Sequence, residues 1–305
     1  MKRVLAVVFS LALLAWLVSD GRWTGLLDAA RRLSPGIVLV AFSGFLASYG
    51  LRTLRIHDEF RREIGHRFGT CLRIVLIHNA LINVLPFRSG EAAFPLLMRQ
   101  TFGTPLTRGI ASLFWLRLQD AFVVLALAAL VWPGLPVALR GAGVAGVVAI
   151  AWYLPRWAQR PHAWLEREGL LHKLGRVRDA FADSARHARF GWLWTLANWS
   201  VKLAAQAWLL AALLPAPLAS GAAGALGAEL AAILPVQGVA GFGTYEAGAA
   251  AALLPAGIPL ARGVQAALAL HLFVIASALT VGGLAWLFTL FSPDSGESDE
   301  LPRTP

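Results

Sequence analysis

Long runs of apolar residues alternate with short polar segments along almost all of the 305-residue chain. Apolar runs of about 20 residues are typical of helices that cross the ~30 Å hydrocarbon core of a bilayer. The pattern predicts full membrane spans at 4–19, 35–54, 109–132, 137–154, 191–214 and 262–290. Two more apolar regions, 70–103 and 221–256, are interrupted near their middles. We therefore predict an all-α polytopic membrane protein.

The two interruptions share one pattern. Each has Leu-Pro, a polar break that contains glycine, and then a glutamate, at Leu85 to Glu91 and at Leu234 to Glu246. Proline removes a backbone donor and glycine loosens the chain, so each break is expected to interrupt a helix. As helices, 70–85 and 91–103 would be about 24 and 20 Å long, too short to cross the core. We predict two re-entrant broken-helix hairpins; the alternative is eight short, tilted helices with proline kinks.

Basic residues indicate how the chain is threaded. The segment 155–190 is rich in Lys and Arg, and 55–69 carries four arginines, Arg55, Arg61, Arg62 and Arg67. Short basic segments are cytoplasmic under the positive-inside rule. Both basic segments reach the cytoplasm if 70–103 returns to the side from which it enters. The chain then divides into two units, about 1–132 and 137–291, each with three full spans and one re-entrant hairpin. Because three is an odd number, the second unit is inverted relative to the first, and the N-terminus and the C-terminus are both cytoplasmic.

Three segments complete the single transmembrane domain 1–291 and its tail. In 155–190, apolar residues recur every three or four positions from Leu170 to Phe181, which predicts a basic amphipathic helix on the cytoplasmic membrane surface. A soluble connecting helix is the alternative. The N-terminus resembles a signal peptide, but no small-x-small cleavage site follows Val18, so we expect an uncleaved first span. The acidic tail 292–305 is expected to be disordered.

Composition excludes several classes of protein. The chain is 57% hydrophobic and only 14% charged, with a mean hydropathy of +0.63, whereas soluble domains carry about 25% charged residues. The net charge of +10 does not point to nucleic acid, because the basic residues lie in short loops between apolar runs. A single cysteine, Cys71, excludes a disulfide framework and a cysteine-rich metal site. We expect no metal, no cofactor and, since no catalytic motif is present, no enzyme.

Charged residues inside apolar sequence mark the candidate site. Such groups are costly in a bilayer and usually face a protein interior or a cavity. They are Arg88, Glu91, Arg99, Arg117, Asp120, Lys202, Glu229, Glu246 and His271.

The breaks themselves predict an anion site. Each precedes a half-helix, whose N-terminus carries unpaired amides that bind anions such as phosphate. Arg88 adds a donor fork, and Gly90, Gly241 and Gly243 would let a head group approach the backbone. The alternative is a purely structural role, in which the glutamates of the two breaks, Glu91 and Glu246, only offset the partial positive charge at their helix N-termini.

Other polar residues leave two interpretations open. Arg117 and Asp120 share a helix face at a spacing of three, which favours an ion pair or a proton-linked gate. Lys202 can pair with Glu229, and His271 is either a hydrogen-bonded core residue or a proton relay. The predicted substrate-binding residues are Arg88, Gly90, Glu91, Arg117, Asp120, Gly241, Gly243 and Glu246.

The ordered set of these motifs resembles a known family, the lysylphosphatidylglycerol synthase transmembrane region or flippase-like membrane proteins. Asn83 to Glu91 is similar to an Asn…Pro…Gly-Glu segment of that family, with altered spacing. Arg117-Leu118-Gln119-Asp120 matches its Arg-x-x-Asp, and Pro235 to Glu246 matches its proline, glycine-rich stretch and glutamate. Leu51 to Arg55 looks like its basic end to the second span. His271 stands where the family commonly has an arginine.

The resemblance implies movement of a lipid between leaflets. We expect a flippase-like transporter of the bacterial inner membrane whose substrate has a phosphate-containing head, aminoacylated or sugar-linked heads included. Membrane lipids would be its partners, together with any separate lipid-modifying enzyme, but no nucleic acid. One alternative is an accessory subunit that holds a lipid for such an enzyme without moving it. Another is an intramembrane enzyme that uses Glu91 and Glu246 as an acid/base pair.

Overall fold

The computed structural model describes four main stretches of the chain, 33–132, 134–160, 189–233 and 239–291, and the isolated residues 31, 179 and 182. Side chains are not described at 86–88, 158 and 290. The predicted first span 4–19, the tail 292–305 and most of the amphipathic segment 155–190 therefore lie outside the described residues.

The described secondary structure is entirely helical. The long helices are α3 (Pro35–Glu59), α7 (Leu106–Val131), α8 (Val137–Ala158), α10 (Gly191–Leu213) and α13 (Leu260–Phe291). The shorter elements are α4 (Arg61–Ile64), α5 (Phe68–Val84), η2 (Pro86–Ala92), α6 (Ala93–Phe102), α11 (Leu218–Ile233), η4 (Val239–Gly241), α12 (Thr244–Leu253) and η5 (Leu254–Ala256). By length and composition, α3, α7, α8 and α13 are candidate membrane spans, and α10 and α11 form one bent pair with an angle of 118°.

The predicted spans within the described residues coincide with these long helices. Both predicted interruptions are also present, because α5 ends before the 3-10 turn η2, and α11 and α12 are separated at 234–243. The helices α5, α6, α11 and α12 have 17, 10, 16 and 10 residues, or about 26, 15, 24 and 15 Å. None of the four alone reaches across a ~30 Å core.

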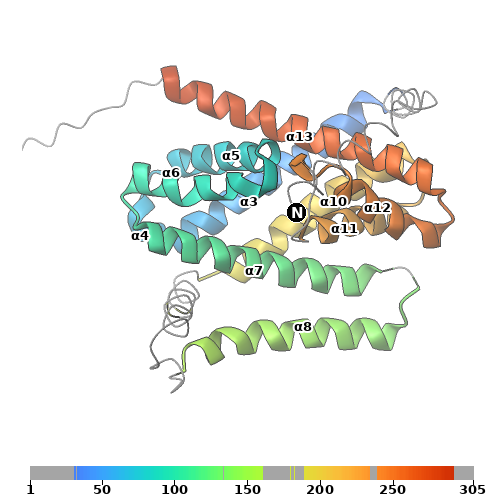
Figure 1. Cartoon of the computed structure of the whole chain (residues 1–305), viewed down its shortest axis with the longest axis horizontal. Coiled ribbons are helices and arrows are strands. Elements are labelled where there is room, and N and C mark those ends of the chain that lie inside the picture. The colour runs from blue at the N-terminus through green and yellow to red at the C-terminus, as the bar shows by residue number, and fades with distance from the viewer. Residues whose placement is uncertain are drawn as a thin grey trace, which may run out of the picture.

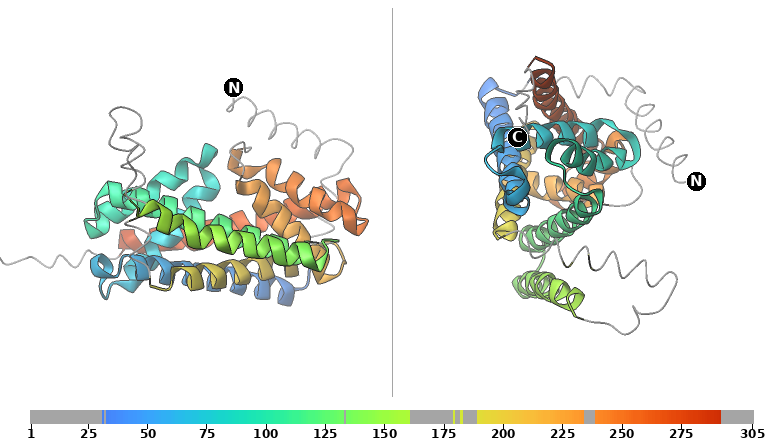
Figure 2. Two further views of the ribbon diagram at one scale, coloured as in Figure 1. Left: turned by 90° about the horizontal axis from the view of Figure 1, so that it is seen from below. Right: turned by 90° about the vertical axis from the view of Figure 1, so that its left-hand side faces the viewer.

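The two broken regions lie at opposite ends of the molecule (Figure 1). The pair α5 and α6 occupies one end, and α11 and α12 occupy the other, while α7 runs the length between them. Their interruptions meet in the middle, where η2 contacts η4. A view from below shows the two pairs as separate arms above α3 and α10 (Figure 2).

Proline and glycine shape both interruptions. Pro86 begins η2 directly after α5, where a continued helix would lack a donor. At Gly90, an added Cβ would lie 2.4 Å from the carbonyl oxygen of Leu81, so only glycine lets the turn fold back onto α5. Gly241 and Gly243 have φ angles of +86° and +87°, a left-handed backbone that glycine adopts without strain. The breaks are thus encoded locally.

Small residues bring the helices together. A Cβ at Gly227 in α11 would lie 2.4 Å from the carbonyl oxygen of Gly248 in α12, so the two backbones touch. A Cβ at Gly44 in α3 would lie 2.7 Å from the Cβ of Ala205 in α10. Close backbone approach through small residues is typical of helix packing in membranes, where burial of apolar surface gives no advantage over lipid.

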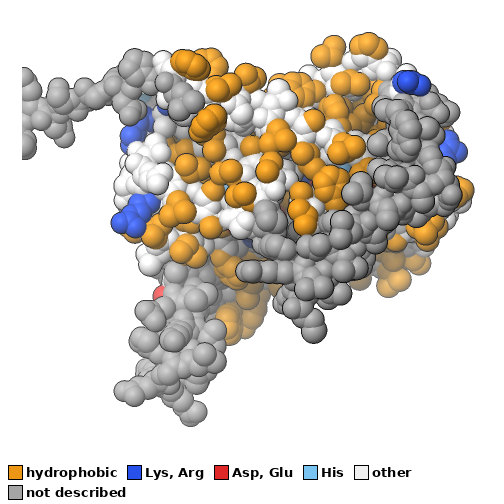
Figure 3. Space-filling view, turned by 45° about the horizontal axis from the view of Figure 1, so that its top comes forward, with side chains coloured by type: hydrophobic (Ala, Val, Ile, Leu, Met, Phe, Trp, Pro, Cys, Tyr) orange, Lys and Arg blue, Asp and Glu red, His pale blue; other side chains and the backbone are white. Residues whose placement is uncertain are grey.

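The outer surface suits a lipid environment. Figure 3 shows one face covered by apolar side chains, with Lys and Arg only towards its edges. Exposed large apolar side chains occur on several of the long helices, for example Val137, Phe288 and Phe291. On a soluble protein such a surface would favour aggregation, whereas in a bilayer it is the surface that contacts the lipid chains.

One helix extends past the predicted end of its span. The span 35–54 was expected to end before Arg55, but α3 continues to Glu59 and buries the Arg55 side chain, which is 2% exposed. The reason is an ion pair with Asp120, 65 residues away, that removes the cost of placing the guanidinium inside.

The backbone contact between α11 and α12 predicts a sharp positional effect on stability. Gly248→Val would place side-chain atoms against Gly227 and Ala231, and we expect a loss of at least about 1–3 kcal/mol. Gly146→Val in α8 is the matched control, because open space surrounds Gly146 and the change should stay within about 0.5 kcal/mol. Unfolding temperatures of the two variants in detergent measure the difference. Equal temperatures would show that the two backbones do not touch.

Candidate functional site

A polar cavity lies where the two interruptions meet. Its volume is about 260 Å³, and residues from α3, α5, α7, α10, α11, α12, α13 and η4 line it. Asn83 and Leu85 mark the side of the first interruption, and Gly241 and Thr244 mark the side of the second. The cavity is therefore enclosed by both broken regions and by the long helices between them.

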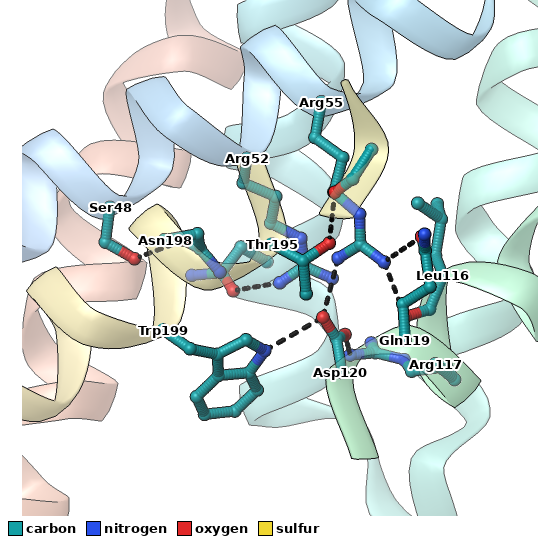
Figure 4. A network of polar contacts seen from close by, with 12 residues as sticks. Ser48, Arg52, Arg55, Leu116, Arg117, Gln119, Asp120, Thr195, Asn198 and Trp199 are labelled. Atoms are coloured by element: carbon teal, nitrogen blue, oxygen red, sulfur yellow. Dashed lines mark hydrogen bonds and ion pairs between the residues drawn. The ribbon is translucent and has the colours of Figure 1, made fainter. Parts of the chain in front are cut away.

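Asp120 forms the charged centre of one wall (Figure 4). Its Oδ1 accepts hydrogen bonds from Arg55 Nη1 at 2.6 Å and from Trp199 Nε1 at 2.9 Å. Arg55 Nη2 also donates to the Leu116 carbonyl at 2.7 Å and to Gln119 Oε1 at 2.9 Å. Because these residues come from α3, α7 and α10, the network joins three long helices.

Arg117 connects this centre to the first interruption. Its Nη1 lies 3.4 Å from Asp120 Oδ2, which is the ion pair that the spacing favours. Its Nε and Nη2 donate to Glu91 Oε2 at 3.0 and 2.9 Å, and Nη2 lies 2.8 Å from Glu91 Oε1. A guanidinium fork on a carboxylate fixes geometry as well as charge. Glu91 therefore anchors η2 to α7.

Arg52 supplies a cation that faces the cavity. It lies one turn of α3 before Arg55, and its Nη1 donates to Asn79 Oδ1 at 3.4 Å. Among the described residues, no carboxylate lies within 4 Å of its guanidinium. Its donors are therefore less committed than those of Arg55 and Arg117, and they face the cavity beside Asn79.

A second charged group lies on α10 and α11. Lys202 Nζ is 2.7 Å from Glu229 Oε1 and 4.5 Å from the centre of the Trp199 ring. Gln206 Nε2 donates to the same glutamate oxygen at 2.7 Å and to the Tyr245 hydroxyl at 3.2 Å. The pairing that the sequence left open for Lys202 is thus present, and Lys202 and Glu229 both line the cavity.

The second interruption ends in a buried pair. Glu246 Oε2 accepts the Gly243 backbone N–H at 2.7 Å, which caps α12. Glu246 Oε1 lies 2.7 Å from His271 Nδ1 on α13, and both side chains are at most 5% exposed. The Tyr245 ring stacks on His271 with centroids 4.3 Å apart. Glu246 therefore combines the capping role with a tie to α13.

The structure separates the predicted site residues into three groups. Arg117, Asp120 and Gly241 line the cavity. Glu91 and Glu246 do not line it, but each bonds directly to a lining residue, as described above. Gly90 and Gly243 shape the turns. The side chain of Arg88 lies outside the described part of the chain, so its assignment to phosphate stays a prediction.

The predicted set lacked four charged or imidazole side chains of the cavity wall, namely Arg52, Lys202, Glu229 and His271. Lys202, Glu229 and His271 were recognised as intramembrane polar residues, but their spacing gave no reason to bring them to the breaks. Arg52 looked like the basic end of a span. Its signal was the repeat of arginine at positions 52 and 55, which places both on one face of α3. Arg99, in contrast, is exposed in the last turn of α6.

Comparison with known protein families identifies the family to which the chain belongs. The family model described as lysylphosphatidylglycerol synthase TM region matches residues 3–282. The chain belongs to this family. The chain is thus a multi-pass membrane protein related to lipid biosynthesis or translocation. No curated protein and no solved structure matches the chain.

The polar groups on the cavity wall are of the kind that binds an anionic group. Among the described residues, no three His, Cys, Asp or Glu side chains gather closely enough to hold a metal. Arg52, Arg117 and Lys202 instead offer several N–H donors to one small space. Such donors match phosphate oxygens, with the arginine forks able to bind two oxygens at once.

The buried position of Arg55 gives a testable consequence. Asp120→Asn leaves the Arg55 charge without its counter-charge, and we expect a loss of about 3–5 kcal/mol of stability. Arg61→Gln is the control, because its contact with Asp58 is long, at 3.8 Å, and Arg61 is partly exposed, so the pair contributes less than about 1 kcal/mol. Unfolding temperatures in detergent report both. The double variant Arg55→Met, Asp120→Leu should recover much of the loss; a double variant as unstable as Asp120→Asn would contradict the ion-pair explanation.

Proposed function

We propose that the chain is a flippase-like transporter that moves a lipid with a phosphate-containing head between the leaflets of the bacterial inner membrane. The observation that carries the proposal is the polar cavity at the meeting point of the two interruptions, with the N–H donors of Arg52, Arg117 and Lys202 on its walls. The head group would occupy this cavity while the acyl chains stay in the surrounding bilayer.

The size and charge of the cavity support a head group. Its volume of about 260 Å³ is below the ~300–1,000 Å³ of pockets that enclose drug-sized ligands. It is therefore suited to a polar head rather than to a whole lipid. Arg52 provides donors that no carboxylate of the described chain occupies, and Arg117 and Lys202 lie on neighbouring walls. A phosphate placed among them would exchange its water shell for charge-assisted hydrogen bonds.

The arrangement of the short helices supports an inverted repeat with two re-entrant hairpins. In that topology α5 and α6 enter from the cytoplasm, and α11 and α12 enter from the opposite side. Their opposite placement in Figure 1 and their short lengths agree with this threading. The basic residues Arg61, Arg62 and Arg67 near the α4 turn would lie on the cytoplasmic side, as would both termini.

Movement of the hairpins would open the cavity to one leaflet at a time. The first hairpin is held to α7 by Arg117 and Glu91, and the second to α13 by His271 and Glu246. Arg117 and His271 both line the cavity. A head group that binds to Arg117 or His271 would therefore weaken the contact that holds the corresponding hairpin. Transporters with broken helices use this rocking around a fixed central site. The chain itself would carry out no chemistry, and a separate enzyme would modify the lipid.

Cysteine accessibility tests the threading. His66→Cys, before α5, and Gln100→Cys, near the end of α6, should both react with an impermeant reagent from the cytoplasmic side. Ala219→Cys and Ala256→Cys, at the outer ends of α11 and α12, should react only from the opposite side. All four positions are exposed, and the native Cys71 is buried. Reaction of His66→Cys and Gln100→Cys from different sides would rule out the first re-entrant hairpin.

Lipid movement in vesicles tests the function. In vesicles that contain fluorescent phosphatidylglycerol, we expect the chain to accelerate transfer between leaflets. Arg52→Gln should slow it by about 10- to 100-fold, because one charge-assisted hydrogen bond contributes about 1.5–3 kcal/mol. The control Arg156→Gln removes an arginine that stacks on Trp152 far from the cavity and should transfer lipid at the wild-type rate.

Three results would contradict the proposal. A wild-type chain that leaves transfer unchanged for phosphatidylglycerol and for aminoacylated or sugar-linked phospholipids is no flippase. Lipid binding without transfer would favour the accessory-subunit alternative. Equal rates for Arg52→Gln and the wild type, with matched unfolding temperatures, would remove the cavity from the transport path.

A further inference from the structure

The pair of His271 and Glu246 is a buried acid–base pair at the cavity wall. Glu246 Oε2 accepts the Gly243 N–H, and Oε1 lies 2.7 Å from His271 Nδ1. With Glu246 as the carboxylate, Nδ1 donates this hydrogen bond, and the other imidazole nitrogen, Nε2, keeps a lone pair. No hydrogen bond joins it to any described residue.

His271 Nε2 is placed towards the cavity. His271 lines the cavity together with Gly241, and Nε2 lies 3.6 Å from the position that a Cβ at Gly241 would take. Aromatic rings hold the imidazole on two sides, Tyr245 with centroids 4.3 Å apart and Phe242 with centroids 4.8 Å apart. Aromatic faces at such distances favour a cationic ring. A proton bound at Nε2 would therefore lie between two aromatic rings and beside the cavity.

The charges of the described groups around the cavity balance when His271 is neutral. Four cationic side chains line it or bond directly to a residue that does: Arg52, Arg55, Arg117 and Lys202. Three carboxylates do the same: Glu91, Asp120 and Glu229. Glu246 adds a fourth negative charge through His271. The described groups therefore sum to zero with a neutral His271 and to one positive charge when His271 is protonated.

Each element around His271 contributes known groups to this balance. Glu246 and Tyr245 face it from α12, Gly241 at the end of η4 and Phe242 after it lie beside it, and α13 itself carries the histidine. Across the cavity stand Tyr49 and Arg52 from α3, Asn79 and Asn83 from α5, Arg117 and Asp120 from α7, Lys202 from α10 and Glu229 from α11. Histidine is the side chain whose charge ordinarily changes between about pH 5 and pH 8, whereas the carboxylates in this set are already held by cationic partners.

We propose that His271, held by Glu246, binds a proton together with a singly anionic lipid head, so that the lipid and the proton cross the membrane together. This inference rests on the proposed lipid transport. Among the described groups, the protonated site has one excess positive charge, which a phosphodiester neutralises. Because linkage is reciprocal, the proton strengthens binding of the anion and the anion strengthens binding of the proton. The proton gradient would therefore drive the anionic lipid in its own direction.

The experiment measures lipid and proton movement in the same vesicles. The full chain is reconstituted with fluorescent phosphatidylglycerol, a pH dye is trapped inside, and the membrane potential is clamped at zero. With a more acidic outside, we expect inward transfer to be several-fold faster than with the gradient reversed, and the interior to acidify as lipid enters. A zwitterionic probe, fluorescent phosphatidylcholine, should show no such dependence.

Two substitutions of the same residue separate the coupling from a structural effect. His271→Gln mimics the neutral ring, so affinity for phosphatidylglycerol in detergent should be weak at every pH. His271→Arg carries a permanent charge, so affinity should stay strong at alkaline pH, where the wild type weakens. Both variants should lose the response to the gradient. His66→Gln, at an exposed histidine outside the cavity, should keep it.

The outcomes distinguish this inference from the transport proposal. Wild-type transfer that ignores the gradient and moves no protons overturns the coupling but leaves the transporter. A His271→Gln variant that still responds to the gradient assigns the proton elsewhere and overturns the inference. If no lipid moves at all, transport fails, and the pH dependence of phosphatidylglycerol binding still decides whether His271 links proton and anion. Should His271→Gln not fold, Glu246→Gln removes the counter-charge and should likewise abolish the pH dependence.

Discussion

The interior of the molecule depends on how one buried carboxylate is satisfied. Asp120 accepts from Arg55 and Trp199 and pairs with Arg117, and Arg117 continues to Glu91 in the first interruption. An unpaired charge in a low-dielectric interior is far more costly than a paired one. The positions of α3, α7, α10 and η2 are therefore fixed by a single set of contacts. The polar cavity exists because these contacts gather the charges on its walls instead of dispersing them.

Local chemistry made the breaks and spans predictable. Proline, glycine and long apolar runs act within a few residues, so the ends of α5 and the start of α12 could be placed from sequence. Arg117 and Asp120 are on one helix face, and their pairing also followed from spacing. Long-range partners were a different matter. Nothing near Arg55 in the sequence indicates that Asp120 will neutralise it, and so the residue was assigned to a loop.

The same reason explains which site residues were missed. Glu246 was recognised from its break, but its partner His271 is 25 residues away on another helix. Arg52 could be assigned to the site only by knowing that α3 continues past it and keeps the same face towards the interior. Once the helices are packed, the two halves differ. The first interruption is held by an arginine, whose charge is permanent, and the second by a histidine, which can be neutral or charged. Two breaks with similar sequences are therefore held by different kinds of polar contact.

The backbone contact between Gly227 and Gly248 has a mechanical consequence. Only glycine and alanine groups lie between α11 and α12 at this contact, so sliding one helix along the other would bring their backbones into collision. We therefore expect the pair to move as one rigid body. Its base lies at the turn between α10 and α11 and at Gly257, which has a left-handed φ of +74°. A rotation of the rigid pair about that base would displace its tip, where Glu246 contacts His271 of α13.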